Sequence, residues 1–197
     1  MNPFTEEYYK TANYSDYMER EQRYHKLAQE IYTLLRSLSI INKYDEILDF
    51  GCATGFLIRG FNELGHLNTS GIEVSDWALE QCKKINLNTS TLAYYNGSPK
   101  VTFMLDVLEH MTDEEINAVF DKIPEAGYRP LVVRIPVAST TGGDYHLEVS
   151  RRDPTHINCK TKEEWKNLLD PYSDRKIIPL NLYTIYDSPG VMSALIL

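Results

Sequence analysis

The order of apolar segments predicts an α/β fold in which helices cover both faces of a mostly parallel β-sheet. Short apolar runs typical of buried strands alternate with longer segments whose apolar residues recur every three to four positions, as on one face of a helix. Capping boxes and a run of glycines after an apolar run mark helix starts. Near the end of the chain, two strand-like runs around a short turn predict an antiparallel hairpin at one edge of the sheet.

The first half of the chain shows this alternation most clearly. Leucine and isoleucine recur at helical spacing over residues 24–38, which predicts a helix with one apolar face. The run 47–50 predicts a short buried strand, and a second helix is expected from Phe56 until Gly65 ends it. Ser75 is the expected N-cap of a third helix. Two further strands are expected at 69–74 and at 89–95.

The second half continues the alternation and then reverses direction. Apolar runs at 101–107 and 131–137 predict buried strands. Two helix starts are indicated by a threonine followed three residues later by a glutamate, the pattern of a capping box. These pairs are Thr112 with Glu115 and Thr161 with Glu164. The runs 176–186 and 191–197 flank the turn 187–190 and predict the antiparallel hairpin.

Length and composition limit the class of protein. The 197 residues suit one domain with its own core. No apolar run approaches the roughly 20 residues of a membrane span. The first residues lack the basic and apolar parts of a signal peptide, so we expect a cytoplasmic protein without membrane contact. The net charge of −8 argues against nucleic-acid binding. The three cysteines form no C-x-x-C pair, and we expect neither a disulfide nor a metal site.

Two segments of the single domain 1–197 are expected to border a site. Residues 138–160 show no clear periodicity, and loops of this length are usually functional or disordered, so we interpret them as a substrate loop. Residues 1–40 form an N-terminal helical cap rich in tyrosine. This cap either docks on the sheet as an amphipathic helix or acts as a lid, with Tyr14 or Tyr17 closing over a ligand.

The glycines after the first strand indicate a loop that a ligand approaches closely. A dinucleotide fingerprint would require a third glycine where Phe56 stands, and no G-K-[ST] follows, so this is neither a pyrophosphate loop nor a P-loop. A tight turn without a ligand remains the alternative. We expect left-handed backbone at Gly51 or Gly55 and not at Ala53, because a side chain disfavours that conformation.

An acid at the tip of the second strand points to a nucleoside. Glu73 follows Asp49 by 24 positions and ends the second strand. In dinucleotide folds, an acid about 20 residues after the glycine loop binds the ribose hydroxyls. A solvated loop carboxylate is the alternative interpretation. Together with the loop, Glu73 favours a nucleoside whose ribose, and not a phosphate, lies at the glycines.

Three motifs together resemble the class I S-adenosylmethionine-dependent methyltransferases. These motifs are ILDFGCATG at 47–55, GIEVSDWALEQCK at 71–83 and LDVLEHM at 105–111. Sequence motifs carry the resemblance over residues 46–111. In the rest of the chain, only the order of strands and helices is similar. It implies a Rossmann-like three-layer sandwich with a seven-stranded sheet. The -LEH- stretch resembles the branch that methylates small molecules such as sugars and ubiquinone precursors. The N-P-P-Y tetrapeptide of the amino-methylating enzymes is absent from the sequence.

The resemblance implies S-adenosylmethionine as cofactor and S-adenosylhomocysteine as product. By this resemblance, Asp49 orients the methionine ammonium group, the backbone near Leu105 faces the same end, and Val74 flanks the adenine. How the adenine amino group is bound stays open. The cofactor-binding residues expected in this way are Asp49, Gly51, Cys52, Ala53, Gly55, Glu73, Val74, Leu105 and Tyr14.

A hydroxyl acceptor would need a general base, and histidine is the usual one near pH 7. His146 and His156 lie in the 138–160 loop and are equal candidates. Asp106, at the end of a strand, is a further candidate that could instead cap the next helix. His110 of -LEH- is interpreted as a positional residue. The loop histidines could also serve only as hydrogen-bonding residues of a structural lid.

The sequence therefore predicts a methyltransferase for a small molecule, with an oxygen of a sugar or related metabolite as acceptor. One alternative is a methyltransferase-like module that binds S-adenosylmethionine or a partner protein without turnover. A less favoured alternative is an NAD-dependent oxidoreductase. The oligomeric state is not predicted.

Overall fold

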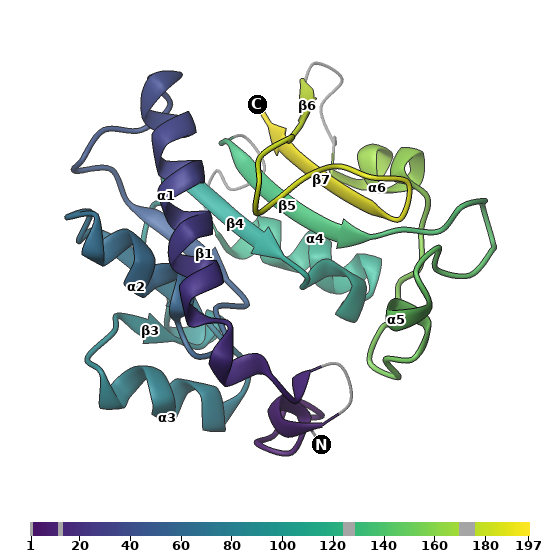
Figure 1. The fold of residues 1–197 in the computed structure, drawn as a ribbon, viewed down its shortest axis with the longest axis horizontal. Helices are drawn as coiled ribbons and strands as arrows, with labels where there is room; N and C mark the ends of the chain where they lie inside the picture. Colours follow the sequence, from purple (N-terminus) through teal and green to yellow (C-terminus); the bar gives the residue numbers. More distant parts are fainter. Residues whose placement is uncertain (1, 12–13, 124–128, 170–175) are drawn as a thin grey trace. The chain divides into compact units, whose positions relative to one another are not determined.

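The computed structural model describes residues 2–11, 14–123, 129–169 and 176–197, and its elements alternate as the sequence predicts (Figure 1). Seven strands form a sheet in the order β3-β2-β1-β4-β5-β7-β6. The pairs β1–β2, β2–β3 and β4–β5 are parallel, whereas β7 is antiparallel to both β5 and β6. This mixed sheet with an antiparallel C-terminal edge confirms the predicted fold class. The chain divides into two compact units, Met1–Val101 and Thr102–Leu197.

Unit 1 contains the first three strands and the helices around them. Its elements are η1 (Tyr8–Lys10), η3 (Tyr17–Glu19), α1 (Glu21–Ser37), β1 (Ile47–Phe50), α2 (Phe56–Glu63), β2 (Thr69–Ile72), α3 (Asp76–Lys84), β3 (Thr89–Ser90) and η4 (Leu92–Tyr94). Both strands β1 and β2 are buried along their whole length, as expected for strands covered on two faces.

Local signals set most boundaries in unit 1. The Ser75 hydroxyl accepts a hydrogen bond from the Ala78 N–H and caps α3, as predicted. Gly65 has a left-handed backbone directly after α2, which confirms it as the residue that ends this helix. The third strand is shorter than predicted, because only Thr89 and Ser90 pair with β2 before the chain turns into η4.

Unit 2 contains the four remaining strands. Its elements are β4 (Val101–Leu105), η5 (Leu108–His110), α4 (Asp113–Lys122), β5 (Leu131–Pro136), α5 (Glu148–Arg151), α6 (Lys162–Leu169), β6 (Ile177–Pro179) and β7 (Val191–Ile196). The core of this unit includes the fully buried Trp165 and Phe103. The described helices include none that is both long enough and apolar enough to cross a bilayer.

Both predicted capping boxes form in unit 2. Thr112 and Glu115 exchange side-chain to backbone hydrogen bonds at the start of α4, and Thr161 and Glu164 do so before α6. The first arm of the hairpin is shorter than predicted. Leu180 still donates to the Ser193 carbonyl of β7, but residues 181–186 fold back on themselves, with Leu182 donating to the Ile185 carbonyl.

Candidate functional site

The loop between β1 and α2 contains three residues in the left-handed region. The φ angles are +77° at Gly51, +47° at Ala53 and +78° at Gly55. The prediction for the two glycines is confirmed, but the prediction that Ala53 avoids this conformation is wrong. The Ala53 N–H donates to Glu73 Oε2 over 2.7 Å, and its carbonyl accepts from the Cys82 thiol over 3.3 Å. These contacts hold a conformation that costs a residue with a Cβ about 1–2 kcal/mol.

Gly55 is required by its surroundings as well as by its backbone. A Cβ at this position would lie 2.2 Å from Cδ1 of Leu87 and 3.1 Å from Sγ of Cys82. The loop is therefore packed tightly against the segment that follows α3. On its other side, the N–H groups of Gly51 and Cys52 both donate to the Ile72 carbonyl, which joins the loop to the end of β2.

The Glu73 carboxylate closes this loop from the end of β2. It accepts three backbone N–H groups, from Ala53 and Val74 over 2.7 Å each and from Ser75 over 2.8 Å. A carboxylate has about four acceptor positions, so one remains. Glu73 is buried, and burial raises its pKa while the three hydrogen bonds lower it. It can accept one ribose hydroxyl in this arrangement, in place of the two expected from the sequence.

Asp49 is the second acid at this loop. It lies within β1 and is buried, with 5% of its surface exposed. Burial raises its pKa to about 7, and the charge of Glu73 adds to this shift. A buried carboxyl group in this state gains stability as an anion when a cation binds beside it. The ammonium group of an amino acid is such a cation.

Aromatic residues of the N-terminal segment cover the loop. Tyr17 stacks on Phe56, the first residue of α2, with centroids 5.5 Å apart, and Tyr9 stacks on Trp77 of α3 at 5.1 Å. Ala53 packs against the same cluster. Burial raises the pKa of both phenols, and the charge of Glu73 adds to this for Tyr9, as that of Asp49 does for Tyr17. The charges of both acids thus act on the phenols that cover the loop.

The other residues expected at the cofactor are placed as follows. Tyr14 is half-buried among the N-terminal tyrosines and contacts Tyr8. Tyr17, and not Tyr14, stacks on Phe56 of α2. The Cys52 thiol is buried against Gly71 of β2 and also donates weakly to the Ala53 carbonyl over 3.9 Å. The Val74 side chain is exposed. Leu105 ends β4 in unit 2.

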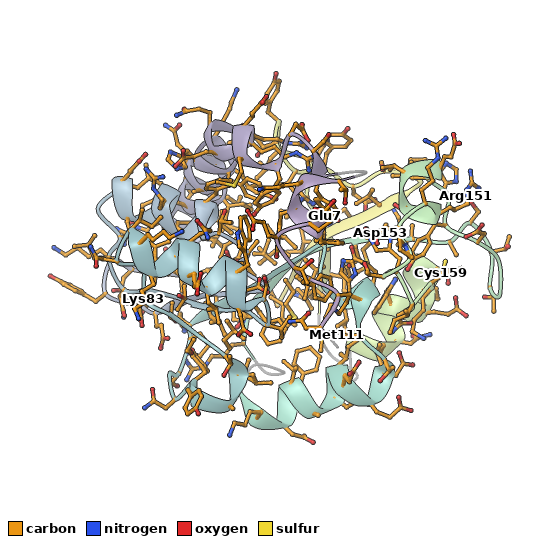
Figure 2. The ribbon with its side chains drawn as sticks, turned by 90° about the horizontal axis from the view of Figure 1, so that it is seen from below. Glu7, Lys83, Met111, Arg151, Asp153 and Cys159 are labelled. Carbon is orange, nitrogen blue, oxygen red and sulfur yellow. The ribbon has the colours of Figure 1, made fainter. Side chains whose placement is uncertain are left out.

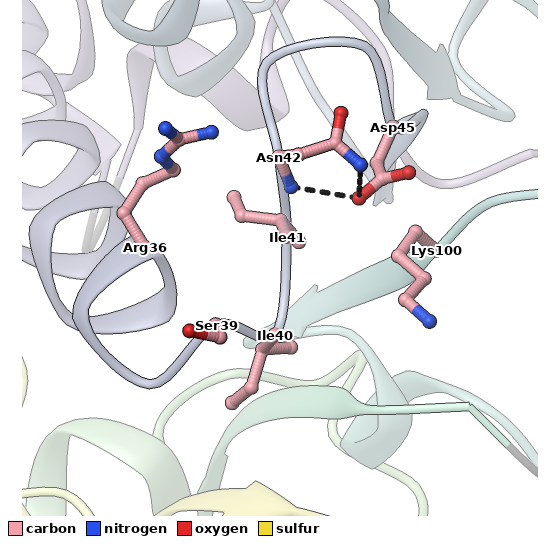
Figure 3. A pocket seen from close by; sticks show the side chains of 7 residues that line it. All are labelled: Arg36, Ser39, Ile40, Ile41, Asn42, Asp45 and Lys100. Atoms are coloured by element: carbon pink, nitrogen blue, oxygen red, sulfur yellow. Dashed lines mark hydrogen bonds between the residues drawn. The ribbon is translucent and has the colours of Figure 1, made fainter.

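A separate hollow of about 420 Å³ lies at the opposite end of β1 (Figure 3). Arg36, Asp45 and Lys100 are among its lining residues, and Asn42 donates to the Asp45 carboxylate through both its backbone N–H and its amide group. This hollow precedes β1, whereas the glycine loop follows it. In open α/β sheets, ligands bind beyond the carboxyl ends of the strands, so the hollow is not the expected cofactor site.

Asp106 directly follows β4 in unit 2 and is paired with a cation. The Arg134 guanidinium of β5 donates through Nε to both carboxylate oxygens over 2.9 Å, and through Nη2 to Oδ2. Asp106 makes no side-chain cap to η5. A carboxylate held in this way is a poor candidate for a general base, because its lone pairs already accept from Arg134.

The two candidate histidines have different surroundings in unit 2. His146 is exposed, and its Nδ1 lies 2.7 Å from the Ser139 hydroxyl. His156 has a buried side chain, and its Nε2 lies 3.9 Å from Glu109 and 3.7 Å from Asp153. Burial lowers the pKa of His156. Glu109 and His156 are 47 positions apart, and no spacing rule in the sequence joins the -LEH- stretch to the long loop.

A glycine loop after β1, acids in β1 and after β2, and an antiparallel hairpin at the sheet edge define the class I S-adenosylmethionine-dependent methyltransferase fold. A family model described as "Methyltransferase domain" matches residues 19–172, and the chain belongs to that family. The resemblance inferred from the sequence is thereby confirmed, while the narrower -LEH- branch remains a prediction. A comparison with curated proteins gives no significant match.

Solved structures share this fold at low sequence identity. A SAM-dependent methyltransferase from Archaeoglobus fulgidus is 15% identical, with a TM-score of 0.60 over 91% of this chain and 98% of that one. The plantazolicin methyltransferase BpumL in complex with SAH is 16% identical, with a TM-score of 0.63 over 92% and 87%. The magnesium protoporphyrin IX methyltransferase from Synechocystis PCC 6803 with bound SAM is 16% identical, with a TM-score of 0.58 over 95% and 93%.

Proposed function

We propose that the protein transfers the methyl group of S-adenosylmethionine to a small molecule and releases S-adenosylhomocysteine. The observation that carries this proposal is the left-handed loop 51–55 with two buried acids, Asp49 and Glu73, directly beside it. Two solved relatives of this fold contain SAM or SAH by their descriptions. Membership of the methyltransferase family supports the same chemistry.

The charges at the loop fit this cofactor better than a dinucleotide. S-adenosylmethionine carries a sulfonium, an ammonium and a carboxylate but no phosphate. Asp49 would bind the ammonium group, and Glu73 would use its one remaining acceptor position for a ribose hydroxyl. Phe56 stands where a dinucleotide fingerprint requires its third glycine, which argues against the oxidoreductase alternative.

The N-terminal tyrosines would have to move when the cofactor enters. Tyr9 and Tyr17 are almost fully buried and pack in a cluster with Phe56 and Ala53 of the loop that would contact the ligand. We infer that residues 2–11 and 14–20 act as a lid that opens to admit the cofactor and closes against it. This favours the lid interpretation of the N-terminal cap over simple docking.

The bound cofactor supplies an activated methyl group, and the protein aligns the acceptor with it. For a hydroxyl acceptor, such as one on a sugar, we propose His146 as the base. It is exposed in the substrate loop, and the Ser139 hydroxyl orients its ring through Nδ1, which leaves Nε2 to take a proton. His156 is the alternative base from the sequence. The choice of a sugar rests on the -LEH- resemblance and on no contact in the structure.

Calorimetry with S-adenosylmethionine, S-adenosylhomocysteine and NAD tests the cofactor. We expect micromolar affinity for the first two and none for NAD, and an absence of binding by both would refute the proposal. Turnover is then followed as release of S-adenosylhomocysteine with a panel of hydroxylated, aminated and carboxylated small molecules. Binding without turnover across the panel would favour the non-catalytic module. Mass spectrometry of ligands that copurify with the protein would identify the acceptor class.

A further inference from the structure

Unit 2 brings two histidines and a glutamate together from distant parts of the sequence. Glu109 and His110 belong to η5, and His156 comes from the 138–160 loop. Each offers one ligand atom, and the three atoms lie within 4.8 Å of one another. The rings of His110 and His156 meet edge to face, with centroids 4.7 Å apart.

Main-chain hydrogen bonds hold these two segments together. The N–H groups of Ile157 and Asn158 both donate to the Glu109 carbonyl, over 2.9 and 3.0 Å. The Asn158 amide group also donates to the Met111 carbonyl over 2.8 Å. In Figure 2, Arg151 lies at the outer edge of the loop and Asp153 lies further in, which agrees with their exposed and buried side chains. The backbone, and not attraction between the three side chains, therefore sets the position of the cluster.

Two members of the cluster bury polar atoms that lack partners. The Glu109 side chain is 1% exposed, and neither of its oxygens makes a hydrogen bond with a described residue. The His156 side chain is 7% exposed, and neither ring nitrogen forms a well-aligned hydrogen bond with a described residue, although a Ser150 backbone group and the Asp153 carboxylate lie nearby. Buried groups of this kind are costly unless something else pairs with them.

His110 is oriented as metal-binding histidines are. Its Nδ1 lies 3.1 Å from the Thr155 carbonyl and 2.9 Å from the Thr155 hydroxyl, which in turn donates to Asp153 over 2.5 Å. A carbonyl only accepts, so Nδ1 carries the proton and Nε2 keeps its lone pair. A second-shell hydrogen bond from one ring nitrogen to a backbone carbonyl is typical of histidines that bind a metal through the other.

The surroundings of the cluster are acidic. Asp153 lies 3.7 Å from the His156 ring, and Glu109 lies 3.9 Å from the same ring nitrogen. The Arg134 guanidinium donates to both carboxylate oxygens of Asp106. A cation between the side chains would offset the remaining negative charge.

We propose that Glu109, His110 and His156 bind a divalent transition-metal ion, such as Zn²⁺ or Mn²⁺. Imidazole nitrogens favour such ions over Mg²⁺, which prefers oxygen ligands. Ligands about 2.1 Å from one ion are about 3.0–3.4 Å apart, so the side chains would close by about 1 Å. Three protein ligands leave positions open for oxygen atoms of a small molecule. The binding of a small molecule to the metal rests on the proposed function, whereas metal binding itself does not.

Calorimetry on EDTA-treated protein, without S-adenosylmethionine, tests this site. We expect one Zn²⁺ or Mn²⁺ per chain with micromolar or tighter affinity, and Mg²⁺ at least tenfold weaker. Glu109→Gln and His156→Asn should each weaken Zn²⁺ binding about 100-fold. His146→Ala is the matched control, because it removes an exposed histidine of the same loop and should leave Zn²⁺ affinity unchanged. Unchanged affinity in either cluster variant would overturn the proposal, as would a wild-type Zn²⁺ Kd above about 100 μM.

A measurement on the wild-type protein covers the case in which a variant does not fold. Substoichiometric Mn²⁺ broadens the amide NMR signals of residues near the ion. We expect the earliest losses at 108–111 and 153–158. Earlier losses elsewhere, for example around His146 or His25, would refute the site whatever the variants do. Neither experiment uses the methyltransferase reaction, so failure here is distinguishable from failure of the proposed function.

Discussion

Replacing Asp49 with asparagine should remove a pH-dependent loss of stability from the cofactor-free protein. The wild-type carboxyl group is buried in β1 and has a pKa of about 7. In the unfolded chain its pKa is close to 3.9. The folded state therefore binds the proton more tightly, and its stability falls as the pH rises from about 4 through about 7. Asparagine has almost the same shape and does not titrate.

The magnitude follows from the difference between the two pKa values. A shift of about 3 units corresponds to about 4 kcal/mol at 1.36 kcal/mol per unit, and nearly all of it is lost by pH 8. At pH 5 the wild-type protein has lost only about 1.5–2 kcal/mol of this stabilisation from the Asp49 proton. The advantage of Asp49→Asn over the wild type should thus grow by about 2.5 kcal/mol between pH 5 and pH 8.

Urea unfolding at the two pH values measures this growth without any cofactor. Asp121→Asn is the control, because Asp121 is an exposed acid on α4 whose replacement should change stability equally at both pH values. A difference in unfolding free energy between Asp49→Asn and the wild type that is equal at both pH values would reflect packing. Only the change of this difference with pH reports on the Asp49 proton. Parallel stability curves for wild type and Asp49→Asn would refute the claim that Asp49 is held protonated in the fold.

Four further expectations concern the glycine loop, the N-terminal lid and the proposed base. Gly55→Ala should destabilise the protein by about 2–4 kcal/mol, since it adds overpacking against Leu87 to the left-handed strain. Gly65→Ala, with the same φ of +78° but open space, should cost only about 1–2 kcal/mol. Equal losses in urea unfolding would contradict the packing argument. Glu73→Gln should destabilise the protein by about 2–3 kcal/mol or more, because a glutamine amide group cannot accept all three N–H groups. An unchanged midpoint of urea unfolding would count against the role of Glu73 in holding the loop. In a Trp165→Phe background, Trp77 fluorescence should change on S-adenosylmethionine binding if the lid moves, and no change despite calorimetric binding would speak against it. Turnover should fall at least about 100-fold in His146→Ala if it is the base, while turnover near the wild-type rate would exclude it.

Local signals explain how much of the fold could be predicted. Capping boxes, the Ser75 cap and Gly65 each involve residues three or four positions apart, so the sequence shows both partners together. The shortened β6 was not predictable, because the run 176–186 is apolar enough for a strand. Its second part instead folds back on itself, and no local rule shows that.

The site shows the same division. The positions of Asp49 and Glu73 at the glycine loop were predicted from strand ends and spacing. The left-handed Ala53 was not, because the hydrogen bond that holds it comes from Glu73, 20 positions away. Tyr17, and not Tyr14, stacks on Phe56. This choice likewise depends on how the N-terminal turns pack.

The sequence by itself determined the α/β class, the order of strands and helices, and the loop where a nucleoside is expected. Periodicity, caps and glycines act over a few residues, and their physics is the same in any fold. Only the tertiary structure decided that Glu73 accepts three backbone N–H groups at the loop, that tyrosines pack over Phe56 and Ala53, and that Glu109 meets His156. Each of these depends on burial and on contacts between segments 20 or more residues apart. Such contacts determine the free energy of a buried polar group, and the spacing of residues along the chain does not reveal them.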